Sequence, residues 1–160
     1  MMIMYADHFA RSYHEGQFRK GSKEPYYNHV VRVAQLIEKY GIHNDESICI
    51  ALLHDTVEDT DMTFDLIRQF GPEVEMGVRA MTKTEYPDRQ SYVRSFETAP
   101  YNIQMIKLCD TLDNAKTIDV LDPESLERKI KEYKNVFIPL AERVAPDIAK
   151  ELKHLLKKYL

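Results

Sequence analysis

The 160-residue sequence predicts an all-α fold, a helical bundle of about seven to nine helices. Three observations support this prediction. Apolar residues recur at helical spacing along almost the whole chain, no segment alternates apolar and polar residues as a half-buried strand does, and glycine or proline separates the helical segments. The length suits one domain with its own core, and neither an internal repeat nor a linker divides the chain. We therefore expect residues 1–160 to form a single domain.

Three helices are predicted in the first third of the chain. The first covers about residues 4–15, where apolar side chains recur at helical spacing. Pro25 suits the first turn of the second helix, and Gly41 ends it. Asn44 or Asp45 can cap the third helix, which is apolar nearly all round. We therefore expect this third helix to lie at the centre of the bundle.

Helices are also predicted in the remaining two thirds of the chain. Further helical patterns cover residues 63–70, 72–82, 89–96, 101–118, a segment beginning at Pro123, a segment that Pro139 interrupts, and a lysine-rich amphipathic tail at 147–159. The apolar face of this tail can close the bundle or pair with a second subunit in a homo-oligomer, and we favour closure of the bundle.

The composition excludes several classes of partner. Twenty-two Lys and Arg residues against 26 Asp and Glu residues give a net charge of −4, so no global positive field attracts nucleic acid or an anionic membrane. The N-terminal residues given lack the basic start, apolar stretch and small-residue cleavage site of a secretory signal, and no apolar run reaches about 18 residues. The two cysteines, Cys49 and Cys109, have aliphatic neighbours typical of buried, reduced thiols. We expect a cytoplasmic protein with no membrane and no nucleic-acid partner.

A local basic cluster is the candidate site for an anionic ligand. Arg19, Lys20 and Lys23 precede the second predicted helix in one short loop. They can bind phosphate groups of a small-molecule substrate, or they can form an ordinary solvated loop. The sequence alone leaves both readings open.

The adjacent pair His54-Asp55 lies at the end of the apolar third helix. An unpartnered carboxylate in such a place costs several kcal/mol, so the pair is a poor core element. His29 and Asp110 lie on two other predicted helices, and helical bundles build metal sites from side chains of facing helices. Two imidazoles and two carboxylates suit Mn, Fe or Zn better than Ca or Mg. The alternative is that His29 is a satisfied core histidine and Asp55 a helix cap.

Glu58 and Asp59 are candidates for proton transfer. If the third helix continues, each lies one turn beyond His54 or Asp55 and can face the same cavity. Neighbouring acids repel one another and raise at least one pKa, as a general acid or base near neutral pH requires. The alternative is that Asp59–Thr63 is a capping and turn segment at the start of the next helix.

Two further residues flank Asp110 on its predicted helix. Asn114 lies one turn later on the same face, where its amide can orient a water or bind a substrate hydroxyl. Lys107 lies three residues earlier and can neutralise a phosphate or extend to solvent, the more common arrangement for lysine.

Together these motifs resemble the HD-domain metal-dependent phosphohydrolases and, within them, the RelA/SpoT-type domains that hydrolyse guanosine tetraphosphate (ppGpp). The resemblance covers about residues 5–120. The matching segments, in family order, are His14–Lys20, Pro25–His29, Ala51–Thr60 with Thr63, Phe70-Gly71, Thr82-Lys83 and Ile106–Asp110.

The resemblance implies an HD-domain helical bundle with a divalent metal cofactor, usually Mn2+. Its four metal ligands correspond to His29, His54, Asp55 and Asp110. The resemblance also implies that Glu58 and Asp59 activate the attacking water or carry its proton. It places Arg19 near the nucleotide base or its phosphates and Asn114 near the ribose.

Three positions depart from the family pattern after Asp110. Thr111, Asp113 and Lys116 stand where the family commonly has arginine, histidine and arginine. The metal and asparagine positions are retained. We therefore expect substrate contacts that differ from those of the family.

These observations lead to one hypothesis and two alternatives. The hypothesis is a ppGpp 3′-pyrophosphohydrolase in which a metal-bound water attacks phosphorus and releases pyrophosphate, while Arg19, Lys20 and Lys23 neutralise the phosphates. The alternatives are a nucleotidase acting on another nucleotide and a nucleotide-binding sensor without catalysis. Because the sequence ends at Leu160, we expect a stand-alone hydrolase without a synthetase domain.

Overall fold

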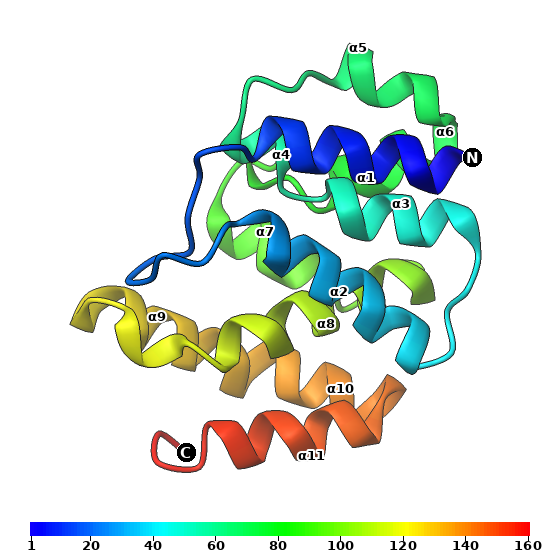
Figure 1. Cartoon of the computed structure of the whole chain (residues 1–160). Coiled ribbons are helices and arrows are strands. Elements are labelled where there is room, and N and C mark those ends of the chain that lie inside the picture. Colours follow the sequence, from blue (N-terminus) through cyan, green and yellow to red (C-terminus); the bar gives the residue numbers. More distant parts are fainter.

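Every regular element of the computed structural model, which describes all 160 residues, is helical (Figure 1). The eleven α-helices are α1 (Met2–Tyr13), α2 (Tyr27–Lys39), α3 (Asp45–Leu53), α4 (Thr56–Asp59), α5 (Phe64–Ile67), α6 (Pro72–Ala80), α7 (Arg89–Ser95), α8 (Tyr101–Ala115), α9 (Pro123–Glu132), α10 (Ile138–Val144) and α11 (Pro146–Leu155). The 3₁₀ segments are η1 (Arg68–Phe70), η2 (Lys83–Glu85) and η3 (Ile118–Val120), and η4 (Tyr133–Phe137) is a π-helix. The predicted all-α bundle is confirmed.

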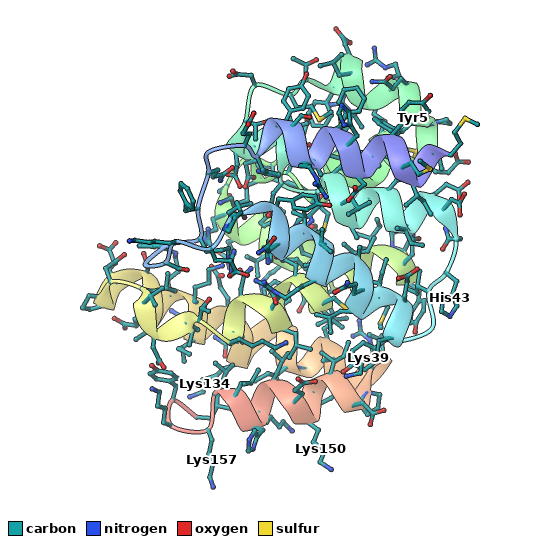
Figure 2. All side chains as sticks on the ribbon, viewed as in Figure 1. Tyr5, Lys39, His43, Lys134, Lys150 and Lys157 are labelled. Carbon is teal, nitrogen blue, oxygen red and sulfur yellow. The ribbon has the colours of Figure 1, made fainter.

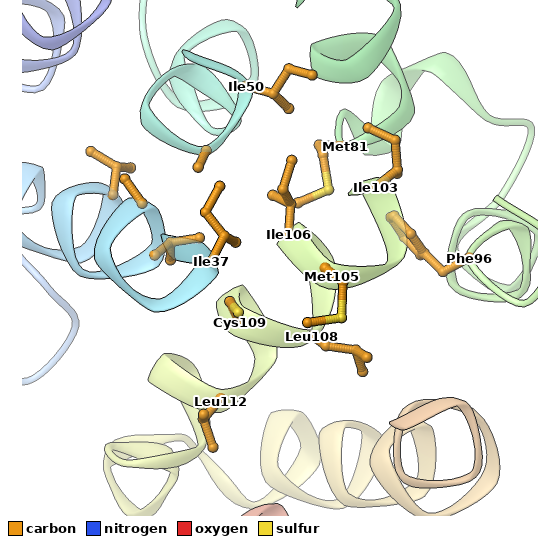
Figure 3. Packing of buried hydrophobic residues seen from close by; sticks show 14 of the residues in the cluster. Ile37, Ile50, Met81, Phe96, Ile103, Met105, Ile106, Leu108, Cys109 and Leu112 are labelled. Carbon is orange, nitrogen blue, oxygen red and sulfur yellow. The ribbon is translucent and has the colours of Figure 1, made fainter. Parts of the chain in front are cut away.

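Helix α3 lies at the centre of the N-terminal half, as its apolar sequence predicts. Seven of its nine residues are buried, and it packs against α1, α2, α6 and α8. Helix α8 crosses the middle of the molecule, where Ile106 points toward Ile37 of α2 and Ile50 of α3 (Figure 3). The facing helices α2, α3 and α8 are therefore held together by one apolar core, which fixes the polar side chains at their ends.

The contact between α3 and α6 requires glycine at position 77. An alanine Cβ there would lie 2.2 Å from Cδ1 and 2.6 Å from Cγ1 of the buried Ile50. Overpacking of this kind costs about 1–3 kcal/mol, more than the helix propensity that alanine gains. We expect Gly77→Ala to lower the free energy of unfolding by about 1–2 kcal/mol, measured by urea denaturation. Adding Ile50→Val should recover part of the loss, and an unchanged unfolding midpoint for Gly77→Ala would contradict this prediction.

In the C-terminal part, the predicted helix start at Pro123 is confirmed and the predicted interruption at Pro139 is wrong. Pro123 begins α9 as predicted, with Asp122 accepting a hydrogen bond from the Ser125 backbone N–H at 2.9 Å. Pro139, however, does not interrupt the helical backbone. The chain passes from α9 through the π-helical η4 into α10, where Pro139 occupies the first turn. The wider π turn and the first-turn position both accommodate a residue that lacks an N–H donor.

Helix α11 covers the lower face of the bundle. It packs against α10 and α8 and buries Ile148 and Leu152, so its apolar stripe is used within the chain. Lys150 and Lys157 point away from the bundle (Figure 2). This arrangement agrees with the predicted closure of the bundle by the tail. None of the helices has the length and apolar character that crossing a membrane requires.

Both cysteines are free and fully buried, as predicted. Burial raises the pKa of the Cys49 and Cys109 thiols to about 12 in each case. Neither thiol is therefore a nucleophile near neutral pH.

Candidate functional site

Four polar side chains converge where α2, α3 and α8 meet. His29 comes from α2, His54 and Asp55 follow α3, and Asp110 comes from α8. One ligand atom from each of the four lies within 4.8 Å of the others. His29 Nε2 lies 3.1 Å from Asp110 Oδ1, and His54 Nε2 lies 3.1 Å from Asp55 Oδ2. The structure thus brings together all four ligands that the sequence predicted.

The break after α3 places His54 and Asp55 at this point. Helix α3 ends at Leu53, and Asp55 is the N-cap residue of the single-turn α4. The Thr56 hydroxyl donates to the Leu53 carbonyl oxygen at 2.7 Å, which satisfies an acceptor left free at the end of α3. The assumption that the third predicted helix continues through Glu58 and Asp59 is therefore wrong, because the chain turns at His54 and Asp55 before α4 begins.

The imidazole of His54 is oriented for metal binding. Its Nδ1 donates to the Ala51 carbonyl oxygen at 2.6 Å, so its Nε2 is the nitrogen left to bind a cation. This Nε2 is buried and has no hydrogen-bond partner, although it faces the two carboxylates. An orphaned imidazole nitrogen beside carboxylate oxygens is the arrangement that a divalent cation would complete. The residues present therefore fit a metal ion.

The charges at the cluster favour a bound cation. Burial alone would raise the pKa of Asp110, but the Lys107 charge and the neighbouring His29 and His54 imidazoles lower it well below its ordinary value. Burial alone would lower the pKa of His54, whereas the Asp55 and Asp110 carboxylates raise it. A metal ion must therefore displace protons from the imidazoles, so metal affinity falls as the pH falls.

A polar cavity of about 260 Å³ opens beside the four candidate ligands. Its charged lining consists of four acidic and four basic side chains. They are Asp55, Glu58, Asp59 and Asp110, with Lys83, Arg89, Lys107 and Lys129. Tyr26, Tyr92 and Asn114 complete the wall. Acids that can accept a proton and cations that can bind phosphate thus face one space.

Glu58 and Asp59 both reach this cavity, as the sequence predicted. The Lys83 backbone N–H donates to Glu58 Oε1 at 2.5 Å, which fixes the Glu58 side chain. Desolvation, together with the Asp55 and Glu58 charges, raises the pKa of Asp59 to about 6. The alternative of a capping segment also holds in part, because Thr63 at its end caps α5 by accepting from the Leu66 backbone N–H.

Lys107 does not extend to solvent, so that interpretation is wrong. Its Nζ donates to Asp110 Oδ2 at 2.9 Å and to the Tyr92 hydroxyl at 3.2 Å. Arg89 and Lys129 also reach the cavity, from α7 and α9, and were not predicted from the sequence. Nothing in their local sequence distinguishes them from other surface cations, and only the packing of these helices around the cavity reveals them.

A second, smaller cavity of about 140 Å³ adjoins the first. The two share Tyr26, Asn114 and Lys129. The Arg19 guanidinium lies 5.4 Å from the centre of the Tyr26 ring and donates to Asn114 Oδ1 at 2.8 Å. Apolar side chains form much of the remaining wall, namely Ile118, Val120 and Leu121. A charged cavity therefore continues into one with a planar cation, an aromatic ring and an apolar wall.

Of the other two residues predicted to bind substrate, Lys20 lies at the smaller cavity and Lys23 lies on the surface. Lys20 lines the smaller cavity and pairs with Asp122 at 3.1 Å, whereas Lys23 is exposed and lines neither cavity. Thr111 and Asp113 are each 2% exposed and also line neither cavity. The expectation that these two departures alter substrate contacts is therefore not supported.

Asp55 and Asp110 each accept a hydrogen bond that the sequence did not predict. The Tyr26 hydroxyl donates to Asp55 Oδ2 at 2.7 Å, and Asn114 Nδ2 donates to Asp110 Oδ1 at 2.9 Å. Tyr26 lies within the Pro25–His29 motif, which was the only signal for it. These contacts fix both carboxylates from the substrate side of the cluster.

Comparisons with known proteins agree with this geometry. A family model described as "HD domain" matches residues 6–145. The guanosine-3′,5′-bis(diphosphate) 3′-pyrophosphohydrolase of Haemophilus influenzae is 37% identical, over 91% of this chain and 23% of the relative. The Aquifex aeolicus protein with the same name is 36% identical, over 99% of this chain and 24% of the relative. The chain thus spans about a quarter of the length of these curated relatives.

A solved structure has the same fold over nearly its full length. It is described as a metazoan ortholog of SpoT that hydrolyses ppGpp, and it is 26% identical to this chain with a TM-score of 0.84. The match covers 99% of this chain and 95% of that one. The family resemblance read from the sequence is therefore confirmed, and the chain belongs to the HD domain family.

Proposed function

We propose that this protein is a metal-dependent phosphohydrolase whose substrate is a nucleotide, and that its reaction is the 3′-pyrophosphohydrolysis of ppGpp. The observation that carries the proposal is the cluster of His29, His54, Asp55 and Asp110 at the wall of a cavity with four cations. The names of the Haemophilus and Aquifex relatives and of the metazoan structure support the substrate.

The four clustered side chains would hold a divalent ion, and we favour Mn2+. Two imidazole nitrogens and two carboxylate oxygens suit a transition-metal ion better than Mg2+ or Ca2+. Such an ion would polarise a phosphoryl oxygen and make a water molecule a stronger nucleophile near neutral pH. Tyr26 and Asn114 keep Asp55 and Asp110 in place by donating hydrogen bonds to them.

The two cavities would bind different parts of the nucleotide. Lys83, Arg89 and Lys129 would neutralise phosphate charge in the larger cavity. The guanidinium of Arg19 and the apolar wall of the smaller cavity would hold the nucleoside. Lys20 at its edge would bind the 5′-diphosphate. Lys23 has no part in this arrangement.

Asp59 would accept a proton from the attacking water. The water attacks the phosphorus bonded to the ribose 3′-oxygen, that P–O bond breaks, and pyrophosphate leaves. The 3′-oxygen receives a proton, so the products are GDP and pyrophosphate. Lys107 keeps Asp110 ionised throughout, because the two groups are only 2.9 Å apart.

Lys129 offers a direct test of phosphate binding. It pairs with no carboxylate, and burial followed by the charge of Lys107 lowers its pKa to about 8. A charge-assisted contact with phosphate contributes about 1.5–3 kcal/mol, so we expect Lys129→Met to lower kcat/KM about 10- to 100-fold. Steady-state release of pyrophosphate measures this change. Lys131→Met, an exposed change on the same helix, is the matched control, and equal kinetics for the two variants would contradict the assignment.

A substrate screen tests the proposed reaction as a whole. Purified protein with Mn2+ is incubated with ppGpp, with nucleoside mono-, di- and triphosphates and with phosphorylated cofactors, and products are separated by ion-exchange chromatography. Conversion of ppGpp to GDP and pyrophosphate is expected. Turnover of monophosphates without turnover of ppGpp would instead indicate a nucleotidase. Nucleotide binding without turnover, in protein that takes up no metal, would indicate a sensor.

A further inference from the structure

Asp113 lies directly behind one of the candidate metal ligands. Its Oδ2 is 2.7 Å from His29 Nδ1, and both side chains are almost fully buried. The opposite nitrogen of the same ring, His29 Nε2, faces Asp110 and Asp55 at 3.1 and 3.6 Å. The imidazole therefore spans the distance between the candidate metal cluster and the Asp113 carboxylate.

This contact decides which nitrogen of His29 can bind a cation. A carboxylate only accepts hydrogen bonds, so Asp113 keeps a proton on Nδ1, and Nε2, which faces the cluster, is the nitrogen that would give up its proton to bind a cation. His54 is oriented in the same way, by the Ala51 carbonyl oxygen at 2.6 Å. A carboxylate behind a ligating imidazole also raises the basicity of the ligand.

Asp113 is itself fixed by an arginine. Arg32 Nε donates to Asp113 Oδ1 at 2.7 Å and Nη2 donates to Oδ2 at 3.1 Å, a two-point contact that sets the plane of the carboxylate. Arg32 also pairs with Glu24, at the end of the loop that carries Arg19. The Arg19 backbone N–H in turn donates to the Glu24 carbonyl oxygen at 2.9 Å.

We propose that Asp113 is a positioning residue that holds His29 for metal binding. Arg32 fixes the Asp113 carboxylate, and Glu24 connects Arg32 to the loop that carries Arg19. The proposal rests on the proposed metal centre but not on the identity of the nucleotide. It also gives a structural role to a position where the family resemblance commonly has histidine.

Metal affinity tests this role without any assay of turnover. Mn2+ is titrated by calorimetry into metal-free wild type, Asp113→Asn and Asp113→Ala. Loss of such an outer contact typically weakens metal binding about 10- to 100-fold, and we expect this loss for both variants. Arg32→Met retains the contact between His29 and Asp113, so we expect a smaller loss. Thr111→Val, at another buried position of α8 that lines neither cavity, is the matched control and should bind Mn2+ as wild type does.

A second measurement separates positioning from simple stabilisation. The melting temperature of each variant is compared with and without saturating Mn2+. Positioning predicts that the increase caused by Mn2+ shrinks in the Asp113 variants, because a weaker ligand stabilises the fold less. A merely structural role would lower both temperatures and leave the increase unchanged, and this result would overturn the proposal. Mn2+ binding within twofold of wild type in both Asp113 variants would overturn it as well. Failure of the wild type to bind Mn2+ would reject the metal centre itself, and with it this inference.

Discussion

Asp55→Ala is expected to abolish metal retention and to lower kcat/KM by about 10³-fold or more. Asp55 supplies a carboxylate oxygen to the cluster and also borders the cavity, so no other side chain replaces it. Metal assistance contributes several kcal/mol to the stabilisation of the transition state, and each 1.36 kcal/mol corresponds to about a tenfold change in rate. The loss should therefore far exceed that of any change in the substrate-binding residues.

Two measurements check this expectation. Elemental analysis after dialysis gives the metal content, and release of pyrophosphate from ppGpp gives the activity. Asp61→Ala is the control, because Asp61 is an exposed aspartate close in the sequence that lines neither cavity. Circular dichroism establishes that both variants are folded. Full activity of a folded, metal-free Asp55→Ala protein would refute metal-dependent hydrolysis.

The helices were predictable because their signals are local. Apolar spacing located α2, α3 and α8, and proline or a capping side chain marked the start of α9. The break between α3 and α4 was not predictable in this way. The chain turns at His54 and Asp55, whose polar groups face Asp110 of α8 and the Tyr26 hydroxyl, and the 3.6-residue pattern does not record such tertiary neighbours.

The candidate ligands were predictable for a different reason. An imidazole and a carboxylate side by side on an apolar helix conflict with core packing, so His54-Asp55 was visible as a violation of the local rules. Asp113, Arg89 and Lys129 violate no such rule. A charged residue on an amphipathic helix is ordinary, and only the tertiary contacts of these three distinguish them from solvated charges. Asp113 was even read as a change in substrate contacts, whereas the structure buries it behind His29.

The roles of the two cavity acids can be separated by their partners. Glu58 is engaged by Lys83, through the backbone N–H at 2.5 Å and the ammonium at 3.5 Å. Asp59 lines the same cavity and accepts no such hydrogen bond, and its pKa is raised to about 6. A base must be free to accept a proton and must have a pKa near the working pH. These two properties favour Asp59 as the proposed proton acceptor and favour the positioning of Lys83 as the role of Glu58.

We therefore expect Asp59→Asn to lower kcat by about 10²- to 10⁴-fold while the protein retains its metal. The dependence of kcat on pH shows in which direction protonation of Asp59 acts. A base with its pKa raised to about 6 is ionised above that pH, so wild-type kcat should fall as the pH falls through about 6. This acid limb should disappear in Asp59→Asn and persist in Glu58→Gln, whose loss of kcat should be smaller. A limb retained in Asp59→Asn would contradict the assignment of proton transfer to Asp59.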